Sequence, residues 1–233
     1  MRVQGRYGLL LAVLVGSYLL AAFNGAKLAT DVQVILFAGV LLIALSTSPL
    51  PGRWPRLIGA IAVIGSVVAY LTSLNGSRVG TASEDLWKAL LLLASAIMVV
   101  RRVLARRTVT IQSIYGALCA YLIIGLMFAA IYAAIGHLDN SSSFFADNQP
   151  ANTQTYQYFS FTTLTTLGYG DFTAAQNGGR AIAVLEAMTG QVFLATLVAR
   201  LVSAYRAPER PERPGRDRLP EDVDGPGDDE DRD

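Results

Sequence analysis

The chain has few of the residues that build disulfides, metal sites and catalytic centres. Its 233 residues include one cysteine, Cys119, and one histidine, His137. A single cysteine cannot form a disulfide within the chain, and its apolar surroundings favour a buried role as a small hydrophobic residue. No group of histidine, cysteine and carboxylate residues has metal-site spacing, and no catalytic cluster is visible. The sequence therefore predicts neither an enzyme nor a protein with a bound cofactor.

Charge is also scarce. Charged residues make up 16% of the chain, hydrophobic residues make up 52%, and the mean hydropathy is +0.40. This composition is too apolar for an ordinary soluble domain. The formal net charge of +1 says little about partners, because the charges are segregated along the chain. We expect membrane lipid as a partner, with no nucleic acid and no soluble substrate.

Apolar runs divide the chain into six predicted membrane spans. Helices are expected because only helices and closed barrels satisfy their backbone groups in lipid, and no strand-like alternation suggests a barrel. The first span has the alternative of a cleaved signal peptide, although its removal would spoil the charge pattern described next. The predicted spans are Tyr7–Phe23, Val32–Leu45, Leu57–Leu74, Leu86–Val100, Ile114–Ile135 and Ala181–Ala204.

Arginine residues mark alternate connections between these spans. By the positive-inside rule, such connections face the cytoplasm. We therefore expect a multi-pass protein of the plasma membrane with both termini cytoplasmic. The arginines in question are Arg2, Arg6, Arg53, Arg56, Arg101, Arg102, Arg106, Arg107, Arg206, Arg210 and Arg213.

A seven-residue motif lies between the fifth and sixth spans. Thr165–Asp171 reads Thr-Thr-Leu-Gly-Tyr-Gly-Asp. A backbone that aims successive carbonyl groups at one axis needs alternating conformations, and Gly168 and Gly170 can adopt positive φ without a Cβ penalty. The Thr166 hydroxyl can add a further oxygen to those of the backbone. The Tyr169 side chain is expected to point away from the axis at which the carbonyl groups are aimed. This string resembles the selectivity filter of the potassium channel superfamily.

The resemblance implies the architecture of the whole chain. It implies an all-α integral membrane protein with six transmembrane helices, a re-entrant pore helix and a filter loop. Because each chain has one filter segment, it also implies a homotetramer around one axis. The permeant ion would be K⁺, and the residues that carry over are the ligands Thr166, Leu167, Gly168, Tyr169 and Gly170, with Asp171 as the outer-mouth acid.

The segment before the motif completes the predicted pore. Residues 136–153 are polar and suggest an extracellular turret loop, and residues 153–165 suggest a short re-entrant helix. The C-terminal end of this helix would point its negative dipole toward the cavity. Tyr158 and Phe159 are expected to form an aromatic cuff around the filter. Thr162 stands where some family members have glutamate, which leaves the hydrogen bonding behind the filter open.

The sixth span resembles a pore-lining inner helix. Gly190 lies in mid-span, where a hinge and a close-packing site are both open interpretations. Glu186 is the one acid within a predicted span, and an ionisable group at membrane depth needs a partner or water. We expect it to brace the base of the pore helix, with the alternative that it lends negative charge to the cavity.

Three domains follow from these observations. Residues 1–110 form a four-helix transmembrane domain, residues 111–205 form the pore domain, and residues 206–233 form a disordered, charged cytoplasmic tail too short to fold a regulatory domain. The fourth span lacks arginines at every third position, so we expect a potassium-selective channel with little voltage sensing. The alternatives are a nonselective cation channel, a nonconducting accessory subunit, and a transporter or membrane enzyme.

Overall fold

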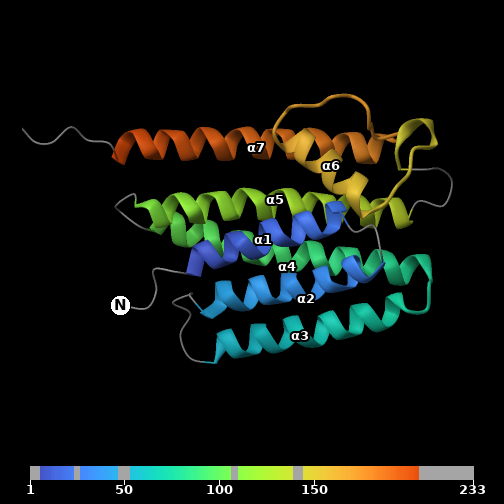
Figure 1. Cartoon of the computed structure of the whole chain (residues 1–233), viewed down its shortest axis with the longest axis horizontal. Coiled ribbons are helices and arrows are strands. Elements are labelled where there is room, and N and C mark those ends of the chain that lie inside the picture. The colour runs from blue at the N-terminus through green and yellow to red at the C-terminus, as the bar shows by residue number, and fades with distance from the viewer. Residues whose placement is uncertain (1–5, 24–26, 47–52, 106–109, 139–143, 205–233) are drawn as a thin grey trace, which may run out of the picture.

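The chain folds into a bundle in which the long helices lie roughly parallel or antiparallel to one another and one short helix is inclined to them (Figure 1). The computed structural model describes residues 6–23, 27–46, 53–105, 110–138 and 144–204, and the predicted tail at 206–233 lies outside them. The described residues contain no strand, only one isolated bridge between Phe145 and Ala174. The helices are α1 (Arg6–Phe23), α2 (Lys27–Ser46), α3 (Trp54–Ser73), α4 (Arg78–Ala105), α5 (Ile111–Leu138), η1 (Ala146–Asn148), α6 (Thr153–Leu164) and α7 (Asn177–Ala204).

The helices are consistent with a helical membrane protein. Within the described residues, three helices are long and apolar enough to cross a bilayer: Pro55–Ser73, Ile111–Leu138 and Asn177–Arg200. Two shorter apolar helices, Tyr7–Leu19 and Gln33–Ile43, fall below that length. The prediction of six spans therefore goes further than these helices, and it stays a prediction.

α4 and α5 form the centre of the bundle. α4 packs against α2, α3 and α5, while α5 also contacts α1, α6 and α7. Small residues allow close approach: a Cβ at Gly65 of α3 would overlap the Trp87 ring of α4, and a Cβ at Gly116 of α5 would lie 2.7 Å from Val103 Cγ2. Of the first four helices, α1 and α4 therefore pack directly on α5, while α2 and α3 pack on α4.

Local sequence explains where several helices start. Gly76 has a φ of 62° in the turn between α3 and α4, a conformation that costs glycine little. Ser77 Oγ then accepts a hydrogen bond from the Gly80 N–H at the start of α4. α6 begins with a capping box, in which Asn152 and Thr155 each bond the other's backbone N–H through their side chains.

The segment predicted as a polar turret contains part of the core. Phe144 and Phe145 are buried, and their rings pack against Tyr156 and Phe159 of α6. The Phe144 O accepts from the Ala175 N–H, and the Ala146 N–H donates to Thr173 O. The segment connects α5 and α6, as expected of a loop, but it is not polar throughout, because burial of the two large Phe144 and Phe145 rings stabilises the fold.

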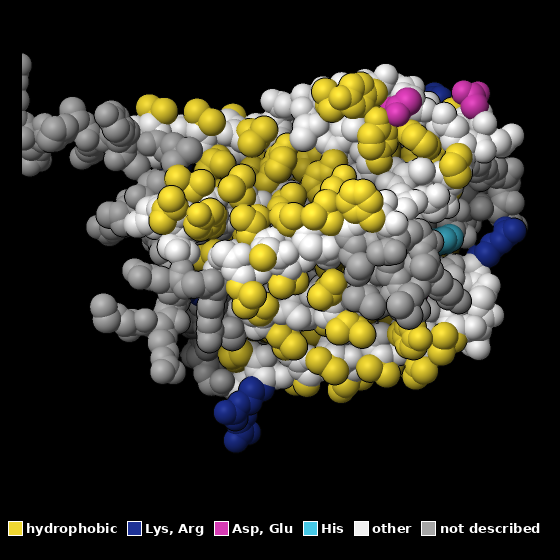
Figure 2. Space-filling model, viewed as in Figure 1, with side chains coloured by type: hydrophobic (Ala, Val, Ile, Leu, Met, Phe, Trp, Pro, Cys, Tyr) yellow, Lys and Arg dark blue, Asp and Glu magenta, His cyan; other side chains and the backbone are white. Residues whose placement is uncertain are grey.

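The outer surface of the bundle is mostly apolar in its middle. Figure 2 shows hydrophobic side chains over the centre of one face, with charged side chains near its two ends. Only 11% of the most apolar stretch of α7 is buried, compared with 61% of the corresponding stretch of α5. Such a surface suits contact with lipid or with other subunits better than contact with water.

The contact between α1 and α5 yields a test of the fold. Cys119 Sγ lies 3.6 Å from Tyr7 O, and the Tyr7 ring points toward Gly116, one helical turn from Cys119. We expect Tyr7→Cys to form a disulfide with the native Cys119 inside one chain under mild oxidation. The product should run as a monomer on a non-reducing gel.

Tyr18→Cys is the matched control for this experiment. Tyr18 lies on the same helix but packs against Phe161, so its thiol has no cysteine near it and should stay free. Disulfide-linked dimers from Tyr7→Cys would instead show that α1 packs on another chain.

Candidate functional site

The loop Thr165–Asp171 connects the end of α6 to the segment that leads into α7. Thr166, Gly168 and Gly170 have φ values of 57°, 48° and 82°, whereas Leu167 and Tyr169 do not have positive φ. Conformations of alternating hand turn successive carbonyl groups toward the same side of a strand. The positive φ expected at the two glycines is present, and Thr166 extends the alternation by one residue.

The left-handed conformation of Thr166 needs support from its surroundings. A non-glycine residue in this region costs about 1–2 kcal/mol. The Thr166 N–H donates to Thr163 O at 2.9 Å, and Gln191 Nε2 of α7 donates to Thr166 Oγ1 at 3.1 Å. Gly168 N–H donates to Thr162 O at 3.1 Å. The loop is therefore anchored from behind by the α6 backbone and by α7.

The Thr162 side chain takes no part in that anchoring. Its hydroxyl donates to Phe159 O within its own helix at 3.0 Å. Hydrogen bonding behind the loop, which the sequence left open, comes from the Thr162 carbonyl group instead. Leu167 and Tyr169 are 54% and 68% exposed, so the rest of the chain leaves most of these two side chains uncovered.

The C-terminal end of the loop is held at Asp171. Tyr158 Oη donates to Asp171 Oδ2 at 2.8 Å, and Gln149 Nε2 donates to Asp171 O at 2.6 Å. The hydrogen bond to the carboxylate raises the pKa of Tyr158 above its ordinary value. Phe172 packs edge-on against Tyr158. This end of the loop is thus tied to both α6 and the segment before it.

Of the two predicted cuff residues, the structure brings only Tyr158 to the loop within the chain. Phe159 is buried and packs against Tyr132 of α5 at a ring-centroid distance of 5.0 Å, and against Phe144 and Phe145. Neighbouring residues on a helix point in directions about 100° apart, which separates the two rings. Phe159 therefore belongs to the core beside α5.

Glu186 joins three helices behind the loop. It is fully buried on α7, where Tyr132 Oη of α5 lies 2.6 Å from Oε2 and Ser160 Oγ of α6 lies 2.5 Å from Oε1. Ser160 Oγ is also 2.7 Å from Gly125 O. A hydroxyl group has only one proton to donate, so one of the two Ser160 contacts needs a proton from elsewhere. A neutral Glu186 that donates to Ser160 satisfies both contacts.

Gly190 lies where α7 meets the end of α6. A Cβ at this position would be 2.2 Å from Leu164 O, which is backbone and cannot swing aside. Tyr121 Oη of α5 donates to the same carbonyl oxygen at 3.2 Å. Of the two interpretations left open by the sequence, this geometry supports close packing.

A buried charged cluster on α4 was missed by the sequence reading. Lys88 Nζ lies 3.0 Å from Glu84 Oε1 and 3.0 Å from Asp85 Oδ1, and all three side chains are buried. Asp85 Oδ2 is 2.8 Å from His137 Nδ1 of α5. The predicted fourth span began at Leu86 and so left both acids outside. The spacing of Glu84 and Lys88, one helical turn apart, was the available signal.

The described residues contain no group of three or more histidine, cysteine and carboxylate residues that could hold a metal ion.

One comparison with known proteins gives a match. Residues 116–207 match a family model described as "Ion channel", which covers most of α5, all of α6, the loop and α7. The chain matches none of the curated proteins compared with it.

Substitution of Gly190 tests the contact between α6 and α7. We expect Gly190→Ala to lower the free energy of unfolding by about 1–3 kcal/mol, because its Cβ pushes α7 away from Leu164. Thermal unfolding in detergent measures the loss. Gly178→Ala on the same helix is the control, since its Cβ meets nothing within 4 Å. Equal melting temperatures for the two variants would contradict this account of Gly190.

Two substitutions of Glu186 test whether its carboxyl group is protonated. Gln can accept from Tyr132 and donate to Ser160, so Glu186→Gln should unfold near the temperature of the parent protein. Glu186→Leu leaves the buried Tyr132 hydroxyl without an acceptor and should cost about 1–3 kcal/mol. If Gln is as destabilising as Leu in the same melting experiment, the buried carboxyl group carries a charge.

Proposed function

We propose that this chain, whose residues 116–207 belong to the ion-channel family, is one subunit of a potassium-selective channel. K⁺ would pass along the backbone oxygens of Thr166, Leu167, Gly168, Tyr169 and Gly170. The observation that carries the proposal is the alternating φ of Thr166, Gly168 and Gly170 within the Thr-Thr-Leu-Gly-Tyr-Gly-Asp motif. Rings of carbonyl oxygens can replace the hydration shell of K⁺.

Four chains would complete the ring. One loop supplies one carbonyl group at each level, and a potassium filter is built from four loops around one axis. The exposed Leu167 and Tyr169 side chains and the apolar surface of α7 support assembly with other copies. The exposed apolar residues of α7 include Val184, Leu194, Val198 and Val202.

The electrostatics of α6 favour a cation beside the loop. The C-terminal end of a helix carries a partial negative charge, equivalent to about half an elementary charge. α6 ends at Leu164, directly before the loop, so its dipole would stabilise an ion that enters the motif. Glu186 is enclosed by Tyr132 and Ser160, which supports a bracing role over a role as a cavity charge.

The arrangement of arginines supports a plasma-membrane protein with cytoplasmic termini. Arg53, Arg101 and Arg200 lie near the same end of the bundle, since α4 and α7 finish there and α3 begins there (Figure 1). By the positive-inside rule, this end would face the cytoplasm. The loop 165–171 would then open toward the outside.

Ion flux into liposomes tests selectivity. Purified tetramer is reconstituted and given an inward gradient of K⁺ or of Na⁺. We expect uptake driven by K⁺ and background uptake of Na⁺, because the ring oxygens would replace the hydration shell of K⁺. Gly168→Asp should abolish uptake, since a side chain at a φ of 48° distorts the loop.

Gly178→Asp is the matched control for flux. Gly178 lies in the first turn of α7, where an acidic residue is tolerated and a Cβ meets nothing within 4 Å. This variant should retain K⁺ uptake. Equal flux of both ions would indicate a nonselective channel, and no flux of either ion from a confirmed tetramer would favour an accessory subunit.

We also expect little voltage dependence. Between Arg78 and Arg101, α4 carries one cation, Lys88, and two carboxylates neutralise it. Moving one charge across 100 mV contributes only about 2.3 kcal/mol, and steep gating needs several such charges. Planar-bilayer recordings over about ±100 mV should give a nearly constant open probability. A steep conductance–voltage curve would show that charges other than Lys88 move.

A further inference from the structure

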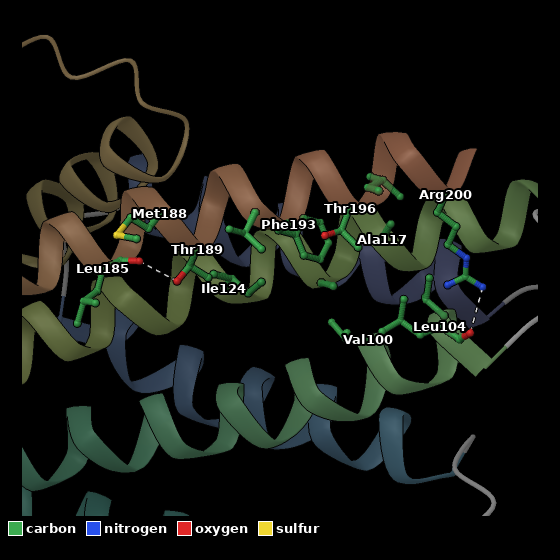
Figure 3. Close-up of a pocket in the computed structure, with 14 residues that line it drawn as sticks. Val100, Leu104, Ala117, Ile124, Leu185, Met188, Thr189, Phe193, Thr196 and Arg200 are labelled. Carbon is green, nitrogen blue, oxygen red and sulfur yellow. Dashed lines mark hydrogen bonds between the residues drawn. The ribbon is translucent and has the colours of Figure 1, made fainter. Parts of the chain in front are cut away.

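An apolar groove of about 510 Å³ lies between α4, α5 and α7 (Figure 3). Val100 and Leu104 of α4, Ala117 of α5, and Met188 and Phe193 of α7 contribute to its walls. Its volume falls within the range of small-molecule sites, about 300–1,000 Å³. The Thr189 hydroxyl donates to Leu185 O at 2.7 Å, inside its own helix, so it adds little polarity to the groove.

The groove carries positive charge at one end. Arg200 lines it, and its Nη2 donates to Leu104 O at 3.2 Å, which fixes the guanidinium beside the end of α4. Arg101 and Arg102 follow Val100 on α4 at the same end. An occupant that complements the groove is therefore apolar along most of its length and negative at the arginine end.

The groove faces away from the part of α7 that contacts the loop. Thr189, Phe193 and Arg200 recur at a spacing that keeps them on one side of a helix. Gln191 points from another side of α7 and donates to Thr166 Oγ1. The groove is thus separate from the candidate ion path.

The groove is long enough to hold an acyl chain that spans one leaflet of a bilayer. Fifteen residues separate Leu185 from Arg200, which corresponds to about 22 Å of helix. One leaflet contributes about half of a hydrocarbon core of about 30 Å. A chain that starts at Arg200 would therefore reach the bilayer centre inside the groove.

We propose that this groove binds one acyl chain of an anionic phospholipid, with the phosphate headgroup at Arg200. Phosphate is a good acceptor for a guanidinium group, and anionic headgroups collect near basic residues at the membrane surface. A second copy of α5 or α7 would complement the arginine end of the groove less well. Among the described residues of these two helices, Glu186 is the only acid, and it is fully buried, so neither helix offers a negative charge to Arg200.

A fluorescent reporter in the groove tests the proposal. Phe193→Trp places an indole among the lining residues, and the signal of the parent protein, from its two tryptophans, is subtracted. The tetramer is reconstituted in phosphatidylcholine vesicles that contain brominated phosphatidylglycerol or brominated phosphatidylcholine at equal mole fraction. We expect at least about twofold stronger quenching by the brominated phosphatidylglycerol, as charge selection predicts.

Two variants in the reporter background separate the headgroup from the tail. Arg200→Gln should remove the preference for phosphatidylglycerol, whereas Arg53→Gln, an exposed arginine at the same end of the bundle, should retain it. Ala117→Leu narrows the groove and should weaken quenching by both lipids. Leu197→Trp is a second reporter position, used if Phe193→Trp fails to assemble.

Three results would overturn the proposal. Equal quenching by the two lipids would show that the headgroup is not selected. A preference that survives Arg200→Gln would place the headgroup elsewhere. Reporters that neither lipid quenches, in a confirmed tetramer, would mean that a second copy of the chain covers the groove. Because the readout is lipid binding, it stays interpretable whether or not the tetramer conducts ions.

Discussion

The hydrogen bonds of Glu186 hold together the three helices on which the loop 165–171 depends. Tyr132 on α5 and Ser160 on α6 converge on one carboxyl group of α7. One turn further along α7, Gly190 allows contact with the end of α6, and Gln191 then reaches Thr166. If α7 moved away from Ser160, the Gln191 contact would also lengthen, and Thr166 would lose its support in a disfavoured conformation. The conformation of the loop thus depends on contacts that lie outside the loop.

Local sequence rules predicted much of the backbone at the site. The motif led to positive φ at Gly168 and Gly170, because glycine is the residue that adopts this region at low cost. The same rule does not extend to Thr166, which is β-branched and avoids positive φ in isolation. Its conformation is imposed by Thr163 and Gln191, and Gln191 is distant in sequence. A contact between residues that are distant in sequence cannot be predicted from the residues of one segment alone.

The remaining differences also arise from tertiary packing. Phe144 and Phe145 lie in a stretch of mostly polar residues, so composition predicted an exposed loop and did not predict that these two rings are buried. The resemblance to potassium channels placed Phe159 with Tyr158 in the aromatic cuff, but neighbouring residues on a helix point in different directions, and Phe159 packs in the core. Hydropathy placed the start of the fourth span after Asp85, because the cost of burying a carboxylate depends on partners such as Lys88 and His137. The contact between Asp85 and His137 can be recognised only from the packing of α4 against α5.

The short connection between α4 and α5 has a consequence for the order of assembly. α4 ends at Ala105 and α5 begins at Ile111, so the two helices pack as neighbours in one chain. α1 likewise contacts both α5 and α6 of its own chain. Each polypeptide can therefore complete almost all of its helix packing as soon as it is synthesised and inserted. In the proposed tetramer, association would come afterwards, between folded protomers, and the loop and the outer side of α7 would then gain their contacts.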